Sequence, residues 1–234
     1  MLQGQARIVV LAGAGLSAAS GVPTFRDAQT GHWATFRPED LATSEAFMRD
    51  PQMVWRWYLS RRETIGQVSP NAGHDALTRW QRERDVTIIT QNVDGLQQRA
   101  GGTVTEFHGN LFVDLCFEEH RVLSATEQHP GEPPRCVHCD AYVRPGVVWF
   151  GENIPTHAMR EAEHAVDHCD IFVSVGTSSL VYPAAGFAEA ALRRGARFIE
   201  INPEETPLSS LADHRLAEPA QIALPALVDA LLSR

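Results

Sequence analysis

Five short apolar runs, separated by stretches of helical character, constrain the fold of this chain more than any other feature. The runs are continuous and rich in valine and isoleucine, which is typical of strands buried on both faces of a parallel sheet. They cover residues 7–13, 86–92, 146–151, 170–177 and 196–202. The pattern predicts an α/β protein with a parallel sheet and helices on both of its faces.

Helix signals fill the stretches between these runs. Residues 161–168 and 184–195 are expected to be helical, and a last helix is expected over residues 225–234. Asp50 followed by Pro51 marks a helix start, with the aspartate as N-cap and the proline in the first helical position. That helix is expected to run for about four turns.

Two segments, residues 28–69 and 113–145, interrupt the alternation of strands and helices. The first holds a loop and then the helix that begins after Asp50, and the second holds three of the four cysteines. We interpret both as insertions that together form a smaller domain. The large domain would then comprise residues 1–27, 70–112 and 146–234.

Composition excludes several classes of function. The net charge of −9 argues against a nucleic-acid partner, which would require a basic face. All twenty basic residues are arginine, so a Schiff-base or P-loop lysine is excluded. No apolar run approaches the length of a membrane span, and the N-terminal run is not that of a signal peptide. We therefore expect a cytoplasmic protein with no nucleic-acid or membrane partner.

A glycine turn follows the first apolar run directly. Its sequence, "GAGLSA", matches G-x-G-x-x-A, in which backbone N–H groups at a helix start approach a pyrophosphate. The same pattern also occurs in ordinary tight turns. A dehydrogenase would carry an acidic residue at the end of a second strand about twenty residues on, but the region "TFRDAQTGHWATF" is no strand. The sequence therefore favours a dinucleotide bound in another way.

Polar residues also close the later runs. Gln91, Asn92 and Asp94 stand at a strand end, where open parallel sheets bind ligands, and could contact a carboxamide and ribose hydroxyls. On local grounds Asp94 is equally well explained as a helix cap. His108, in "EFHGN", is a candidate general base or a structural histidine. With the turns "GTSS" and "INPE", these strand ends predict one nucleotide cleft.

The segment "VWRWYLSRRE" raises a separate question. Tyr58 and Arg61 are three residues apart and share one face of the expected helix. They could form a surface cation–π pair or a receptor for a carboxylate, and the local sequence leaves both open. The cysteine pair in "CVHC" indicates metal or redox chemistry rather than a structural disulfide.

Together these motifs resemble one family. "GAGLSAASGVPTFR", "TQNVDGL", "FHGN", "VVWFGE", "GTSSLVYPAAGF" and "INPE" occur in the order and spacing of the sirtuins, which are NAD-dependent protein lysine deacylases. The resemblance implies a Rossmann-like large domain, a small domain with a helical and a zinc-binding part, and an active cleft between them. NAD would be consumed as a cosubstrate, the acyl group would pass to ADP-ribose, and nicotinamide would be released.

The resemblance also assigns individual residues. His108 would be the general base. The NAD site would comprise Gly13, Ala14, Gly15, Ser17, Phe25, Arg26, Gln91, Asn92, Asp94, Gly176, Thr177, Ser178, Asn202, Gln221 and Ile222. The acyl-lysine protein would bind as an added strand between two segments, namely Val148, Trp149, Phe150 and Gly151 on one side and Val181 and Tyr182 on the other.

The metal motif departs from the family pattern, which has two C-x-x-C pairs for a structural zinc. Cys136 and Cys139 form the second pair, whereas the first reads "CFEEH", with Cys116 present and Glu119 in place of a cysteine. Glu119 or His120 could complete the zinc site, since carboxylate and imidazole both bind zinc. His138 and Asp140 are further options, and the module could also fold without metal.

The acyl specificity follows from the same resemblance. The branch of the family that removes succinyl, malonyl and glutaryl groups carries Y-x-x-R beside the acyl channel, and this chain has Tyr58 and Arg61 there, with the small Ala42 nearby. A desuccinylase or demalonylase with weaker deacetylase activity is therefore expected. The alternatives are a non-catalytic module that binds NAD or ADP-ribose, and an NAD-dependent oxidoreductase, against which the missing acidic strand end and the absence of lysine count.

Overall fold

The computed structural model describes residues 6–23 and 41–233. Its main sheet has six parallel strands. In spatial order these are β11 (His214–Leu216), β10 (Arg197–Ile201), β9 (Ile171–Val175), β1 (Ile8–Ala12), β2 (Val86–Thr90) and β3 (Thr105–Glu106). Numbered along the chain and read from the β3 edge, this order is 3-2-1-4-5-6, which is the order of Rossmann dinucleotide-binding sheets. The predicted parallel α/β sheet is confirmed.

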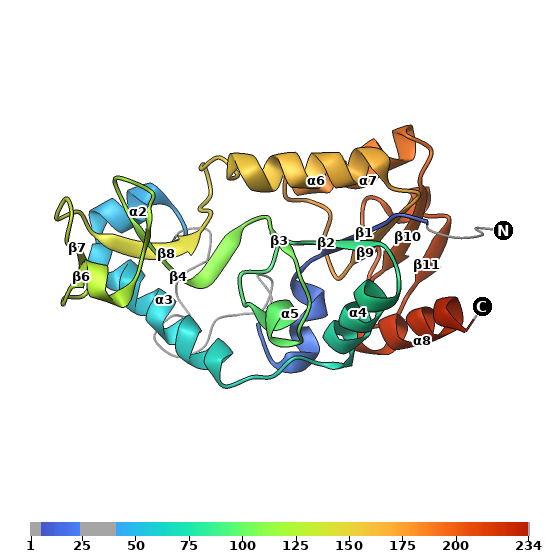
Figure 1. Ribbon diagram of the computed structural model, residues 1–234, viewed down its shortest axis with the longest axis horizontal. Helices are drawn as coiled ribbons and strands as arrows, with labels where there is room; N and C mark the ends of the chain where they lie inside the picture. Colours follow the sequence, from blue (N-terminus) through green and yellow to red (C-terminus); the bar gives the residue numbers. More distant parts are fainter. Residues whose placement is uncertain (1–5, 24–40, 234) are drawn as a thin grey trace.

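Helices cover both faces of this sheet (Figure 1). One face carries α4 (Ala72–Glu83) and α8 (Ala220–Leu232), and the other carries α6 (Thr156–His168) and α7 (Phe187–Arg193). In β1, Val10 packs toward α4 and α8, while Val9 and Leu11 pack toward α6 and α7. Successive strand residues point to opposite faces, so a strand that is covered on both sides must be apolar throughout.

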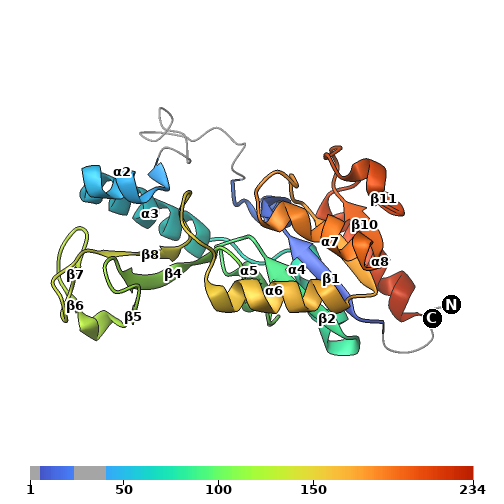
Figure 2. The same cartoon turned by 90° about the horizontal axis from the view of Figure 1, so that it is seen from above.

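The second unit lies at the opposite end of the long axis from β10, β11 and α8 (Figures 1 and 2). Its helices are α2 (Ser44–Arg49) and α3 (Pro51–Gly66). Its strands form a three-stranded sheet and a hairpin, consisting of β4 (Gly109–Cys116), β5 (Val122–Leu123) and β8 (Val143–Val147), and of β6 (Gln128–His129) and β7 (Arg135–Cys136). The division into domains at the predicted residues stays a prediction. β4 begins before the predicted boundary at 112, and β8 ends after the boundary at 145.

The start of α3 follows the predicted chemistry. The Asp50 side chain accepts a hydrogen bond of 2.9 Å from the backbone N–H of Met53, and Pro51 occupies the first helical position. α3 is 16 residues long, which matches the expected four turns. Its buried residues include Trp57 and Tyr58, which pack with Phe47 of α2 and Trp149 beyond β8. This packing holds the helix that carries Arg61 against the end of β8.

Three expectations differ from the structure. The run 146–151 is not a strand of the parallel sheet, because β8 pairs antiparallel with β4 in the small unit. The C-terminal helix starts at Ala220 rather than near Pro225, so the proline lies within it. The glycine turn opens two 3₁₀ turns, η1 (Ala14–Leu16) and η2 (Ala18–Ser20), and not one long helix. Among the described residues, no helix is both long and apolar enough to span a membrane.

Candidate active site

The glycine turn lies at the point where the strand order reverses, between β1 and β9. The Gly15 N–H donates a 2.8 Å hydrogen bond to the carbonyl of Gly176, the residue that follows β9. A methyl group built on Gly15 would lie 2.7 Å from the Gly176 Cα, and Gly176 itself has a positive φ of 58°. Only glycine fits this close approach of two strand ends. The site is therefore the crevice in which sheets of this order bind ligands.

A buried polar cluster lies directly behind the turn. Ser17, which is fully buried, donates a 2.6 Å hydrogen bond from its hydroxyl to Asp94. The Asn92 side-chain amide donates to the Ser17 Oγ at 3.2 Å and to the Gly13 carbonyl at 3.0 Å. His74 completes the cluster, with its Nε2 at 3.3 Å from the Ser17 Oγ. These bonds fix the position of the glycine turn from inside the protein.

The tautomer of His74 follows from its neighbours. The Asn71 backbone N–H donates to the His74 Nδ1 at 3.2 Å, so this nitrogen is the acceptor and Nε2 carries the proton. Burial lowers the pKa of His74 below its ordinary value of 6.5, against the opposing carboxylates of Asp94 and Asp75. The sequence reasoning missed His74. Its signal was the spacing Asn71-x-x-His74 at the start of α4, which forms a capping box.

His108 lies between β3 and β4 and is partly buried. Its Nδ1 is 3.1 Å from the Gln91 carbonyl, which can only accept, so Nδ1 carries the proton and the Nε2 lone pair is available. Burial lowers the pKa of His108 below 6.5, against the opposing effect of the Gln91 carbonyl. A histidine that is neutral near pH 7 with a free Nε2 has the state required of a general base.

Gln91 and Thr177 connect His108 to the end of β9. The Gln91 side-chain amide donates to the Thr177 hydroxyl at 3.0 Å, and the Asn202 amide donates to the Thr177 carbonyl at 2.9 Å. Thr177 thus lies between Gln91, at the end of β2, and Asn202, at the end of β10. Gln221 and Ile222 lie in the first turn of α8, which packs against η1.

The residues predicted for NAD, except two, are therefore found at the carboxyl edge of the parallel sheet or at the adjacent start of α8. Phe25 and Arg26 lie outside the described residues. The role of each residue in NAD binding stays a prediction. For Ser17 we expect a role in positioning the glycine turn rather than a direct side-chain contact with NAD, because its side chain is buried and already bonded to Asp94.

Tyr58 and Arg61 are not a surface pair. Tyr58 is buried, and its hydroxyl oxygen accepts a 2.8 Å hydrogen bond from the Trp149 Nε1–H. That bond uses the oxygen as acceptor and leaves the hydroxyl proton free for another partner. Burial raises the pKa of Tyr58 far above 10, so the hydroxyl stays protonated and can donate.

The Arg61 guanidinium lies over the Trp57 ring, with its Cζ 5.3 Å from the ring centroid. Within residues 6–23 and 41–233, no carboxylate forms an ion pair with Arg61. Burial lowers the pKa of this guanidinium, and Tyr58 and Asp94 only partly offset the effect. The next residue, Arg62, differs in this respect, because it forms an ion pair with Asp114 at 2.6 Å.

The segment after β8 holds the residues predicted to pair with a substrate strand. The Val148 N–H donates to the His108 carbonyl and the Phe150 N–H to the Ala42 carbonyl, both at 2.9 Å. The Trp149 N–H is bonded to the Glu152 carboxylate at 2.8 Å. Among the described residues, the Gly151 N–H and the Val148 carbonyl form no backbone hydrogen bond and are open to a partner strand.

The other predicted flank of the substrate, Val181 and Tyr182, lies in the turn after β9. The two side chains are 42% and 73% exposed. The described contacts do not join them to residues 148–151, so their role in peptide binding stays a prediction.

Arg144 was also missed by the sequence reasoning. It is buried, and its Cζ stacks 3.4 Å above the Trp149 ring, while its guanidinium pairs with Glu152. Glu152 in turn holds the Trp149 backbone N–H at 2.8 Å. The pair therefore fixes the indole that contacts Tyr58. The signal in the sequence was an arginine and a glutamate eight residues apart around "VVWFG".

Three of the four cysteines lie together at the far end of the small unit. Cys116, Glu119, Cys136 and Cys139 each offer one ligand atom, and these atoms all lie within 4.8 Å of one another. The Sγ atoms of Cys116 and Cys139 are 3.4 Å apart. Sulfur and carboxylate oxygen are both ligands of structural zinc. This group could hold a zinc ion.

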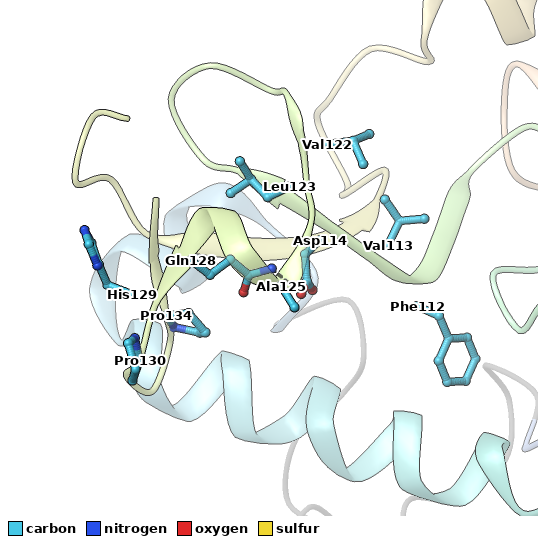
Figure 3. A pocket seen from close by; sticks show the side chains of 10 residues that line it. All are labelled: Phe112, Val113, Asp114, Val122, Leu123, Ala125, Gln128, His129, Pro130 and Pro134. Carbon is cyan, nitrogen blue, oxygen red and sulfur yellow. Dashed lines mark hydrogen bonds between the residues drawn. The ribbon is translucent and has the colours of Figure 1, made fainter. Parts of the chain in front are cut away.

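A separate cavity of about 540 Å³ lies on the small unit between β4, β5 and the β6–β7 hairpin (Figure 3). Its acidic group, Asp114, already accepts a hydrogen bond from Gln128 at 3.0 Å and pairs with Arg62. None of the residues predicted to bind NAD or substrate lines this cavity. It is distinct from the crevice around the glycine turn.

Comparison with known proteins identifies close relatives. The Sir2 family model matches residues 13–183. An NAD-dependent protein deacylase of Ralstonia nicotianae is 50% identical over 223 residues, which cover 95% of this chain and 91% of that relative. A protein of the same name from Aquifex aeolicus is 46% identical over 96% of this chain and 95% of its own.

Solved structures of Sir2 proteins are also similar to this chain. A Sir2 homologue in complex with NAD matches with a TM-score of 0.90 at 41% identity, covering 97% of this chain and 90% of that chain. A Sir2 protein bound to a propionylated peptide matches with a TM-score of 0.83 at 27% identity, covering 96% and 92%.

Proposed function

The chain belongs to the Sir2 family and is an NAD-dependent protein lysine deacylase, and from this premise we propose that it prefers lysines carrying an acidic acyl group, succinyl or malonyl, over acetyl-lysine. Family membership rules out the two alternative functions, an oxidoreductase and a non-catalytic NAD-binding module. The acyl preference rests on one observation. Arg61 is a partly buried guanidinium that forms no ion pair with a carboxylate among the described residues, and it lies beside Tyr58, whose hydroxyl proton is free.

The preference follows from the cost of leaving a charge unpaired. A guanidinium held away from water is stabilised by a carboxylate that accepts two parallel N–H bonds, and a terminal carboxylate of the acyl group would supply it. The Tyr58 hydroxyl would add a third bond from the same face of α3. An acetyl group offers no such acceptor and would leave Arg61 as it is in the free protein.

In the reaction, NAD when bound supplies an electrophilic ribose carbon with nicotinamide as the leaving group. His108 contributes the base, with Nε2 taking a proton from a ribose hydroxyl while Nδ1 stays bonded to the Gln91 carbonyl. The substrate peptide would bind along residues 148–151, where the Gly151 N–H and Val148 carbonyl are open. Sir2 proteins have been solved with a propionylated peptide and with a p53 peptide, which supports a peptide as the substrate of this chain.

A matched set of acyl peptides tests the proposal. One peptide sequence would carry acetyl-, succinyl-, malonyl- or butyryl-lysine, and nicotinamide release would be measured at saturating NAD. Butyryl has the four carbons of succinyl without its carboxylate, so it separates chain length from charge. We expect the highest kcat/KM for succinyl- and malonyl-lysine. Equal turnover of succinyl and butyryl peptides would refute a charge-based preference, while nicotinamide release from any acyl peptide would still show deacylation.

A further inference from the structure

The two halves of the cysteine site are built alike. In the first half, the His120 N–H bonds to the Cys116 carbonyl at 3.0 Å, and in the second the Asp140 N–H bonds to the Cys136 carbonyl at 2.9 Å. Both His120 and Asp140 have a positive φ, of 53° and 58°. Each half is therefore a tight turn. It starts at a cysteine, carries a candidate ligand three residues later, and closes with a hydrogen bond from the next residue.

Glu119 occupies in the first turn the place that Cys139 occupies in the second. The Glu119 N–H points at the Cys116 sulfur at 3.4 Å, and the Cys139 N–H points in the same way at the Cys136 sulfur. Burial follows the same pattern, since Cys116 and Cys136 are buried while Glu119 and Cys139 are exposed. The backbone of the first turn thus presents the residue at position 119 as a ligand, although that residue is not a cysteine.

The side chain of Glu119 is oriented for the same task. Its Oε2 accepts a 2.6 Å hydrogen bond from Arg121, so one carboxylate oxygen is bonded and the other is left for a metal. Ligating carboxylates commonly have such an outer partner, which orients them. With Zn–S bonds of about 2.3 Å, tetrahedral ligand atoms lie roughly 3.8 Å apart. The observed separations, within 4.8 Å, require only small side-chain movements.

The other residues that could complete the site are placed less well. The His138 Nε2 is bonded to Glu127 at 3.2 Å. His120 and Asp140 occupy the closing positions of the two turns, and neither belongs to the group of mutually close ligand atoms found in the described part of the chain. We propose that Glu119 is the fourth ligand of a Cys₃Glu zinc site, in which a carboxylate oxygen replaces the fourth sulfur of the usual four-cysteine site.

Metal binding to the purified full-length chain tests this inference without reference to acyl selectivity. Zinc content would be measured by elemental analysis, and affinity by competition with a chromogenic chelator of known zinc affinity. Co²⁺ would be added in place of zinc, because the intensity of its thiolate charge-transfer band reports the number of bound sulfurs. We expect one zinc per chain and a three-thiolate Co²⁺ spectrum.

Substitutions at position 119 give the decisive comparison. Glu119→Ala should weaken zinc binding by at least about 100-fold, because the loss of a ligand costs more than the loss of an outer partner, which costs about 10–100-fold. Glu119→Cys should retain the zinc and raise the charge-transfer intensity toward a four-thiolate spectrum. Glu118→Ala removes the same charge from the neighbouring exposed residue and should change neither quantity, and circular dichroism would verify that each variant is folded.

Three results would overturn the proposal. The first is a folded wild-type protein that takes up no zinc. The second is a Glu119→Ala variant with unchanged zinc affinity. The third is a loss of affinity in His120→Ala or His138→Ala as large as that in Glu119→Ala, which would assign the fourth ligand to a histidine.

Discussion

Replacing Arg61 by methionine should lower kcat/KM for a succinyl-lysine peptide about 150-fold and leave that for the acetyl-lysine peptide within about threefold. Methionine keeps a flexible apolar side chain of similar length that can still pack on Trp57, so the substitution removes mainly the charge. A hydrogen bond to a charged group contributes about 1.5–3 kcal/mol. Arg61 is only partly buried, so we take about 3 kcal/mol for the two-bond pair, which corresponds to roughly a 150-fold change in kcat/KM.

The assay is nicotinamide release with the succinyl, butyryl and acetyl peptides at saturating NAD. The KM for NAD should be measured for each variant, because Asp94 of the NAD side interacts electrostatically with Arg61. Arg56→Met is the matched control, since Arg56 lies on the same helix but is exposed and paired with Glu132. It should leave every kcat/KM unchanged.

The reasoning fails if Arg61→Met reduces succinyl and acetyl turnover by the same factor. Such a result would mean that Arg61 only supports the packing of α3 on Trp57. A loss confined to succinyl that also appeared in Arg56→Met would point instead to long-range attraction of an acidic peptide.

Further predictions concern two residues, His108 and Tyr58. His108→Ala should lower the rate of deacylation by about two to four orders of magnitude, which is the usual contribution of a general base. The NAD affinity measured by calorimetry should change little. Activity within a few-fold of wild type would remove His108 from the mechanism. Because burial lowers the pKa of His108, the neutral base persists below pH 6.5, and kcat/KM should fall only as the pH drops through that lowered pKa, as a pH–rate profile would show. Tyr58→Phe should reduce the succinyl-to-acetyl ratio by about tenfold, less than Arg61→Met, because a single hydrogen bond from a neutral donor to the carboxylate contributes about 1.5 kcal/mol. An unchanged ratio would exclude the hydroxyl from the receptor. The same variant should also have a lower urea concentration at the midpoint of unfolding, because it leaves the Trp149 N–H buried without its acceptor.

Much of the large domain follows from the sequence because burial on two faces leaves a strong local signal. Val9 and Val10 face opposite helical layers, so the whole of β1 is apolar, and β2, β9 and β10 are likewise rich in valine, isoleucine and phenylalanine. β3 and β11 have two and three residues, too short for such a signal. The run "GVVWFG" has the same composition as the central strands, but its pairing with β4 depends on contacts across the cysteine module and not on local preference.

The site was predictable where strand ends carry polar residues, and less so where burial decides the role. Gln91, Asn92 and Asp94 do lie beside the glycine turn, but the sequence did not show that Ser17 is bonded inside the protein. His74 was missed because a capping histidine has no distinctive pattern beyond its spacing. The buried pair of Arg144 and Glu152 shows the same limit, since ion pairing between a strand and a following loop depends on the tertiary fold.

One helix links the acyl receptor to the proposed zinc site. Trp55, near the start of α3, packs in the apolar cluster that contains Cys116 and Cys136, and Tyr58 lies about one turn further along. Arg62 of the same helix donates a 2.7 Å hydrogen bond from its Nε to the Leu111 carbonyl of β4. A structural metal contributes to stability by holding its module folded, so loss of the metal would loosen the packing around Trp55 and with it the position of α3. The described residues that are predicted to bind NAD lie at the edge of the parallel sheet or at the start of α8, and none of them belongs to the apolar cluster around Trp55, Cys116 and Cys136. Metal loss should therefore weaken the discrimination between acyl groups before it weakens NAD binding, because the helix that carries Tyr58 and Arg61 is held in place from the cysteine end.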